Sequence, residues 1–316
     1  MATTSAPAIA TRGLTKSYAD RTVLTGLDLT VAEGSVFALL GPNGAGKTTT
    51  VQILTTLVAP DAGQIRICGH DAARDPGAVR RAIGVTGQFA AVDPLLTTEE
   101  NMWLMADLHH LDRQEGRSRS SALLSRFDLA EAGRAQVATL SGGMRRKLDL
   151  AMTLVGRPRV LFLDEPTTGL DPRSRRTMWE IIRQLVAEDG VTVFLTTQYL
   201  EEADQLADRI ALLDGGRIIA EGTADQLKRR IPGGHIRLRF THGAQLDTAA
   251  RAFSSLQVRC DRDALTLDIP GDGSIPALRA VLDLLDASDA RAEQLTVHTP
   301  DLDDVFLTLT HKEPAR

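Results

Sequence analysis

A glycine-rich segment at residues 41–48 carries the clearest chemical pattern in this sequence. It is Gly41-Pro-Asn-Gly-Ala-Gly-Lys47-Thr48 and matches the spacing G-x-x-x-x-G-K-[ST]. Glycines let consecutive backbone N–H groups turn inward around phosphate oxygens, where a Cβ would obstruct them. In such a loop the Lys47 amine reaches the β- and γ-phosphates, and the Thr48 hydroxyl ligates Mg²⁺. The segment therefore predicts a nucleotide site.

The elements around this loop are those that such a site needs. Ser35–Leu40 is an apolar run that predicts a buried strand before the loop, and we expect a helix over 47–57 after it. The helix start adds the positive end of its dipole at the phosphates. The alternative is a glycine-rich turn that happens to precede a lysine, and the flanking pattern argues against it. The predicted phosphate-binding residues are Gly41, Pro42, Asn43, Gly44, Ala45, Gly46, Lys47, Thr48 and Thr49.

Two adjacent carboxylates follow a second apolar run. Arg159–Leu163 predicts a buried strand, and Asp164-Glu165-Pro166 comes directly after it. A carboxylate at the tip of such a strand is placed to hold Mg²⁺, and we assign this role to Asp164. Glu165 can point at the γ-phosphate and is the candidate general base for the attacking water. Alone, these residues could simply open a loop; beside the phosphate-binding loop, they predict nucleotide hydrolysis.

A third pattern, Leu140-Ser-Gly-Gly-Met144, lies just before the acidic strand. Ser141 is a natural N-cap for a helix that continues through residues 145–152. This predicts a second anion-binding helix start in the chain. Ser-Gly-Gly by itself is common in turns and linkers, so the pattern is informative only because of the two motifs that accompany it.

With these motifs in this order, residues 8–222 resemble the ATP-binding cassette (ABC) family. The resemblance implies an α/β fold of the P-loop NTPase type. That fold has a mostly parallel sheet, an antiparallel β subdomain and an inserted helical subdomain at about residues 89–158. The resemblance depends on Tyr18, the loop 41–48, Gln88 in Val85-Thr-Gly-Gln, Leu140–Met144, Asp164-Glu165 and Gly169-Leu-Asp171.

In the proteins that this chain resembles, two cassettes close head to tail around ATP. The helix start at Ser141 of one copy would complete the γ-phosphate site of the other. Tyr18 would stack on adenine, with a core tyrosine as the structural alternative. Asp171 would lie across the dimer seam, although an N-cap role in front of Pro172 explains this residue as well. The ATP-binding residues implied beyond the loop are Tyr18, Ser141, Gly142, Gly143 and Asp171.

The resemblance also gives Gln88 a role, in contact with Mg²⁺ and the attacking water. At Gln198 the chain departs from the family, which usually has a histidine after the strand corresponding to 191–197. A glutamine amide can donate a hydrogen bond to the γ-phosphate but carries no positive charge near pH 7. We therefore expect weaker or less pH-sensitive hydrolysis. The expected catalytic residues are Lys47, Gln88, Glu165 and Gln198, and the expected metal ligands are Thr48, Gln88 and Asp164.

Three further segments are similar to the daunorubicin/doxorubicin-resistance ATPases of actinobacterial drug exporters. They are Gly44–Leu57, Thr196–Arg209 and Leu302–Leu307. This similarity implies a homodimeric motor that uses ATP and Mg²⁺. The motor would be bound peripherally to the cytoplasmic face of the membrane and would work through a separate multi-span permease subunit. The cargo would be a hydrophobic drug or a lipid-like compound.

The organisation changes near residue 230, where a basic helix end is followed by Pro232-Gly233-Gly234. We expect a cassette over 1–230 and an accessory domain over 231–316. The βαββαβ order of the accessory domain fits a small split-βαβ fold, an α+β domain with an added final helix. Its predicted strands are 235–240, 256–260, 264–269 and 291–298, and its predicted helices are 245–254, 275–285 and 302–309.

The composition, 43% hydrophobic and 24% charged with a net charge of −5, is ordinary for a soluble globular protein. A protein that binds nucleic acid by neutralising phosphates normally has a basic face, so no nucleic-acid partner is expected. No apolar run reaches the roughly 18–20 residues of a bilayer span, and residues 1–13 lack the apolar core of a signal peptide. Another chain must therefore supply any span. Cys68 and Cys260 have no metal-ligand spacing, and we expect buried, reduced thiols.

Other functions remain open beside an exporter motor. Some ABC importer ATPases carry a small βαββαβ tail as a regulatory domain, so the fold does not separate import from export. Soluble, non-transport ABC ATPases resemble tandem cassettes or carry long coiled coils, whereas this chain has one cassette and no sustained heptads. A phosphotransferase that used the same loop would leave Leu140–Met144 unexplained. Export fits the three further segments best.

Overall fold

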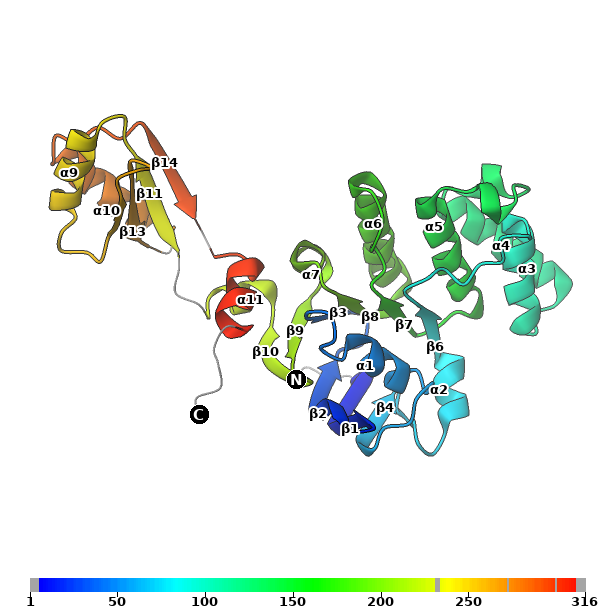
Figure 1. The fold of residues 1–316 in the computed structure, drawn as a ribbon. Helices are drawn as coiled ribbons and strands as arrows, with labels where there is room; N and C mark the ends of the chain where they lie inside the picture. The colour runs from blue at the N-terminus through cyan, green and yellow to red at the C-terminus, as the bar shows by residue number, and fades with distance from the viewer. Residues whose placement is uncertain (1–5, 231–233, 272, 299, 311–316) are drawn as a thin grey trace, which may run out of the picture. The chain divides into compact units, whose positions relative to one another are not determined.

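The computed structural model describes residues 6–230, 234–271, 273–298 and 300–310 (Figure 1). The chain forms two compact units that divide between Ala224 and Asp225, six residues before the expected boundary. The short helix α8 (Ala224–Lys228) spans this division. The expected helix stop at Pro232 and Gly233 lies outside the described residues.

A six-stranded sheet forms the centre of the first unit, in the order β10-β9-β3-β8-β7-β6. All neighbouring strands are parallel except the hairpin pair β9 and β10. Every residue of β3, β7 and β8 is buried, as expected for strands covered on both faces. The strands are β3 (Val36–Leu40), β6 (Ile83–Thr86), β7 (Val160–Asp164), β8 (Thr192–Thr197), β9 (Arg209–Asp214) and β10 (Arg217–Gly222).

Helices cover this sheet, and in Figure 1 α1 lies below the strands while α5, α6 and α7 lie above them. The first helix ends at Leu54 rather than at the predicted residue 57. Its last turn is followed by Thr56, whose φ of 62° does not continue a helix. The helices are α1 (Lys47–Leu54), α2 (Pro76–Ala82), α5 (Gly142–Thr153), α6 (Pro172–Asp189) and α7 (Leu200–Leu206).

A second, antiparallel sheet in this unit has the order β2-β1-β4-β5. Its first two strands are joined by a two-residue turn at Ala19 and Asp20, and Ala19 has the positive φ (48°) of such turns. Leucines of these strands share one apolar core with α1 and with Phe37, Phe162 and Phe194 of the central sheet. The strands are β1 (Ile9–Tyr18), β2 (Arg21–Val31), β4 (Ala62–Ile67) and β5 (His70–Asp71).

Within the helical subdomain expected at about residues 89–158, the chain forms the helices α3 (Thr98–Leu108) and α4 (Arg113–Arg126). Thr97 and Glu100 form a reciprocal capping box at the start of α3, which satisfies two otherwise unpaired amides. Three short 3₁₀ turns connect this lobe with the rest of the unit. They are η1 (Ala130–Ala132), η2 (Val137–Thr139) and η3 (Leu154–Gly156).

The second unit contains a four-stranded antiparallel sheet in the order β12-β13-β11-β14, which is the arrangement of a split-βαβ fold. All four strands are shorter than predicted. Leu256 N donates to Phe253 O in a turn after α9, so the strand predicted from residue 256 begins at Arg259. The elements are β11 (His235–Arg239), α9 (Gly243–Ala252), β12 (Arg259–Asp261), β13 (Thr266–Pro270), α10 (Ile275–Asp286), β14 (Gln294–His298) and α11 (Leu302–Thr310).

The prediction of buried thiols is wrong for Cys260, which is exposed, and Cys68 is only half-buried. Cys260 lies on the three-residue edge strand β12, whose side chains are all exposed. Cys68 occupies the turn between β4 and β5 with a φ of 50°. Both thiols are free. Over the described ranges, no helix has the length and apolar character that crossing a membrane requires.

Candidate active site

The phosphate-binding loop connects β3 to α1, as predicted. Gly44 and Gly46 have φ values of 83° and 110°, a left-handed conformation that side chains rarely adopt. A Cβ on Gly46 would lie 2.7 Å from a methyl carbon of Leu24 on β2. The second glycine is therefore required by its backbone conformation and by the packing of the antiparallel sheet against the loop.

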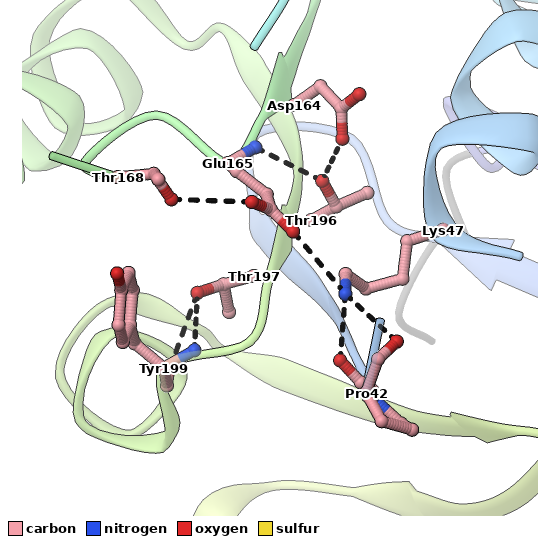
Figure 2. A network of polar contacts seen from close by, with 9 residues as sticks. Pro42, Lys47, Asp164, Glu165, Thr168, Thr196, Thr197 and Tyr199 are labelled. Atoms are coloured by element: carbon pink, nitrogen blue, oxygen red, sulfur yellow. Dashed lines mark hydrogen bonds and ion pairs between the residues drawn. The ribbon is translucent and has the colours of Figure 1, made fainter. Parts of the chain in front are cut away.

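Lys47 is the first residue of α1 and only 5% exposed. Its Nζ donates to the carbonyls of Gly41 (2.8 Å) and Pro42 (3.2 Å) and lies 3.4 Å from Glu165 Oε1. Figure 2 shows the amine between the loop carbonyls and the carboxylate. The structure therefore places a fixed positive charge inside the loop, beside the candidate general base.

The two carboxylates lie at the end of β7, as predicted, and both residues are buried. Thr196 of the neighbouring strand β8 donates its hydroxyl to Asp164 Oδ1 (2.5 Å) and accepts from the Glu165 amide (3.1 Å) (Figure 2). Glu165 has a φ of 50°, which is uncommon for a residue with a side chain and is typical of functional sites. Thr168 Oγ1 donates to Glu165 Oε2 at 3.3 Å. Sequence reasoning did not predict the role of Thr196, because it depends on which strand pairs with β7.

A cleft of about 330 Å³ opens over the loop and collects most of the predicted residues. Gly41, Ala45 and Asp164 are buried and are not among its lining residues. Arg21 and Val23 also line it, and sequence reasoning missed both. The lining residues are Tyr18, Arg21, Val23, Pro42, Asn43, Gly44, Gly46, Lys47, Thr48, Thr49, Gln88 and Glu165.

Tyr18 and Arg21 are direct partners across the β1–β2 hairpin turn. Directly opposed residues of an antiparallel pair project from the same face of the sheet, so both side chains reach the cleft. Tyr18 is 45% exposed, which excludes the alternative of a core tyrosine, and Lys16 Nζ lies 5.3 Å from its ring centroid. Arg21 follows Tyr18 by three residues across the hairpin turn. This spacing is the sequence signal that could have identified Arg21 as a second residue lining the cleft.

The segment 141–143 lies outside this cleft. Ser141 accepts from Met144 N (3.2 Å) and caps α5, as predicted. Ser141 and Gly142 are exposed, and the space around Gly142 is open where a Cβ would stand. The cleft of a single chain thus includes the loop and Glu165, the candidate general base, and it does not include the Ser-Gly-Gly helix start.

Asp171 also lies outside the cleft and has the predicted N-cap role. It accepts from the amides of Arg173 and Ser174 (both 3.0 Å) and from the Ser174 hydroxyl (2.5 Å) at the start of α6. The Ser174 hydroxyl, followed by these amides, holds the pKa of Asp171 below its ordinary value. The capping bonds explain the residue type at this position without a partner chain.

Gln198 directly follows β8 and is partly exposed, outside the lining of the cleft. Tyr199 N donates to Thr197 Oγ1 (2.9 Å), so a hydrogen-bonded turn brackets Gln198 (Figure 2). The Arg175 guanidinium lies over the Tyr199 ring, 4.7 Å from its centroid. The chain places Gln198 one strand away from Glu165, because β8 pairs with β7.

A buried glutamate, Glu202 on α7, was not predicted as a site residue. Its Oε1 accepts from Thr167 Oγ1 (2.8 Å) and from Trp179 Nε1 (3.1 Å). Burial raises the pKa of Glu202. This carboxyl links the segment after Glu165 to the helix after Gln198, which are two parts of the site that are distant in sequence.

The donor atoms around the cleft fit a magnesium ion. The Thr48 hydroxyl, the Gln88 amide and the Asp164 carboxylate offer oxygen ligands, which Mg²⁺ prefers. In the part of the chain that the structure describes, no group of three or more His, Cys, Asp or Glu forms a separate metal cluster.

Comparison with known proteins identifies the family of this site. Residues 24–168 match the family model described as ABC transporter. The chain is 50% identical over 303 residues to the daunorubicin resistance ATP-binding protein DrrA3 of Streptomyces coeruleorubidus, and the match covers 96% of each chain. It is 46% identical over 307 residues to the daunorubicin/doxorubicin resistance ATP-binding protein DrrA of Streptomyces peucetius, with 96% of this chain and 92% of that one covered.

A solved structure agrees with the cassette. It is an ATP-binding cassette in a dimeric, post-hydrolysis state bound to ADP and Pi, with 27% identity and a TM-score of 0.62. The match covers 68% of this chain and 98% of that one. The predicted family and fold class are thereby confirmed. The chain belongs to the ABC transporter ATP-binding proteins, in the daunorubicin/doxorubicin-resistance family, and is an ATP hydrolase.

Proposed function

We propose that this ATP hydrolase is the motor subunit of an exporter. Closure of a homodimer on Mg-ATP would drive a hydrophobic drug or lipid-like compound through a separate membrane subunit. The observation that supports the hydrolytic step is the meeting of Lys47 and Glu165 in one cleft, 3.4 Å apart. The support for export is the similarity to the two daunorubicin-resistance proteins over 96% of the chain.

In the proposed reaction, Lys47 and the loop amides bind the β- and γ-phosphates, and Glu165 accepts a proton from the attacking water. Thr48, Gln88 and Asp164 would hold Mg²⁺, which supplies neutralisation of the charge that develops on the phosphates. Tyr18 provides a ring for adenine, and Arg21 a guanidinium between that ring and the loop.

The homodimer is proposed because a single chain leaves its second anion-binding helix start outside the cleft. Ser141, Gly142 and Gly143 sit at the exposed beginning of α5, where backbone amides and the helix dipole favour an anion. A second copy, arranged head to tail, would bring them to the γ-phosphate. Asp171 would then lie at the seam in addition to capping α6, and Gln198 would sense the γ-phosphate.

Exposed apolar side chains support a membrane partner on the helical lobe. Phe89 is 85% exposed and Leu95 80%, on the segment between Gln88 and α3. Leu104 and Leu108 on α3 are exposed as well. We propose that a cytoplasmic helix of the permease covers these residues, which places this chain peripherally on the cytoplasmic face of the membrane. The neighbouring Gln88 would report the partner's state to the nucleotide.

The experiment is co-expression of this chain with candidate multi-span membrane proteins from the same genome. A complex that purifies intact and whose ATPase rate increases with daunorubicin is expected. Phe89→Ser should reduce the complex without reducing nucleotide binding, because Phe89 does not line the cleft. Absence of a complex, with no change in rate on adding drug, would argue against an exporter motor, and a requirement for a secreted binding protein would indicate import.

A further inference from the structure

Helix α5 carries a buried ion pair that the hydrolytic site does not by itself explain. Arg146 is 7% exposed and Asp149 3%, one helical turn apart, with Nη1 and Oδ2 separated by 3.3 Å. Burying two charges costs free energy unless each is paired and hydrogen-bonded. The other contacts of these two side chains therefore indicate what the pair does.

Arg146 joins two segments of the active site. Its Nη1 donates to Gly87 O (2.6 Å), directly before Gln88. Its Nε donates to Pro166 O (2.9 Å), and its Nη2 lies 3.4 Å from Asp164 O, so the guanidinium contacts the backbone on both sides of Glu165. Arginine is the only side chain with a planar fork of donors that can serve several carbonyls at once.

Asp149 holds the other end of the Gln88 segment. Its Oδ1 accepts from Ala91 N at 3.0 Å. Gln88 and Phe89, both exposed, thus lie between two backbone anchors at 87 and 91. Burial raises the pKa of Asp149 and lowers the pKa of Arg146, and the carboxylate opposes the second change. Each charge thus offsets the free-energy cost of burying the other, and the hydrogen bonds of the two side chains hold the segment 87–91 in place.

We infer that the Arg146–Asp149 pair positions Gln88 relative to Glu165, so that the magnesium and water ligand and the general base keep a fixed geometry. The pair acts through backbone contacts and is a positioning device rather than a catalytic one. The inference rests on the proposed role of Gln88. Ser141 caps the same helix, so one element connects the start of α5 with the Gln88 segment of its own chain.

The test uses the purified full-length chain with Arg146→Lys and Asp149→Asn. Lysine keeps the positive charge but loses the planar set of guanidinium donors. Asparagine keeps an acceptor for the Ala91 amide but loses the negative charge. Substitution of residues that hold metal ligands in place typically lowers metal affinity or activity by about 10- to 100-fold. We therefore expect the Mg²⁺ concentration for half-maximal ATPase rate to increase at least about tenfold. The affinity for ATP in EDTA should stay within about twofold, because neither residue lines the cleft.

Lys147→Gln is the matched control on the same helix. Lys147 Nζ donates to Phe127 O (3.2 Å) and lies 3.4 Å from Asp128, away from the Gln88 segment. Its removal should leave the Mg²⁺ dependence at the wild-type value. If Arg146→Lys does not fold, Asp149→Asn carries the test. Amide hydrogen exchange of residues 87–91 provides a second measurement, and exchange should become faster in Asp149→Asn.

Gln88→Ala, alone and combined with Arg146→Lys, separates this inference from the proposed function. If Gln88→Ala leaves the Mg²⁺ dependence unchanged, the proposed role of Gln88 is wrong. If Gln88→Ala increases the Mg²⁺ requirement and the double variant resembles it, the positioning role is supported. If the increases in Mg²⁺ requirement of Gln88→Ala and Arg146→Lys multiply in the double variant, the positioning role is overturned. The same holds if Arg146→Lys and Asp149→Asn behave as wild type.

Discussion

Lys47 and Glu165 face each other across the cleft, with 3.4 Å between amine and carboxylate and only 5% and 10% of the two side chains exposed. Lys47 belongs to α1, and Glu165 directly follows β7. Their contact places the proposed phosphate ligand and the proposed general base on neighbouring elements. Glu165 also has a left-handed backbone conformation, with a φ of 50°.

Glu165→Gln should abolish turnover while nucleotide binding persists. The amide keeps the size of the side chain but cannot accept a proton from water, and general base catalysis contributes about 10²- to 10⁴-fold. Steady-state ATPase rate and nucleotide titration measure the two effects. In Mg-ATP with the membrane subunit present, this variant should form a stable dimer, visible by size-exclusion chromatography. A variant that stays monomeric under these conditions contradicts the head-to-tail model.

Arg21→Ala should weaken ATP binding about three- to tenfold, the effect of one partly exposed charge-assisted hydrogen bond. The loss should shrink as ionic strength increases, because screening already weakens the wild-type contact. Fluorescent-nucleotide titrations at two salt concentrations measure this. Arg12→Ala is the matched control, an exposed arginine on β1 outside the cleft. Equal affinities for both variants would exclude a nucleotide contact by Arg21.

Gln198→Ala should lower kcat about tenfold, as expected for one hydrogen bond of roughly 1.4 kcal/mol to the γ-phosphate. Gln198→His should restore activity and make it pH-dependent. The rate should increase as pH falls toward about 6.5, because the imidazolium then donates a charge-assisted bond. A pH–rate profile of wild type and both variants checks this. Unchanged turnover in Gln198→Ala, with Glu165→Gln inactive, would leave Gln198 without a sensing role.

Glu202→Gln should stabilise the protein more at pH 8 than at pH 5.5. Burial raises the pKa of Glu202 in the folded state. In the unfolded chain, the Glu202 carboxyl loses its proton at about pH 4.3. Between that pH and the higher pKa of the folded state, the unfolded state binds fewer protons than the folded state. The free energy of unfolding therefore falls as pH rises through this range. Glutamine removes this penalty and can still accept from Thr167 and Trp179. Urea denaturation followed by tryptophan fluorescence at the two pH values measures the difference; a larger gain at pH 5.5 would contradict it.

The cassette motifs were predictable because each depends on residues adjacent in sequence. The loop at 41–48, the acidic end of β7 and the capped start of α5 all lie where the sequence placed them. The hairpin of β9 and β10 was predictable for the same reason, since Gly215 and Gly216 have positive φ and allow a tight turn. Ends of elements were less predictable. Residues 55–57 leave α1 although their side chains fit a helix, because Thr56 turns the chain.

The sequence alone thus determined the order of the elements and predicted the chemistry they would carry: which residues bind phosphate, which hold Mg²⁺ and which accept a proton. Only the tertiary structure decided which distant residues support them. Thr196 binds Asp164 because β8 pairs with β7 in parallel, and Arg146 reaches Gly87 and Pro166 because α5 packs where those segments meet. Such contacts depend on how whole elements pack, and no spacing along the chain encodes them.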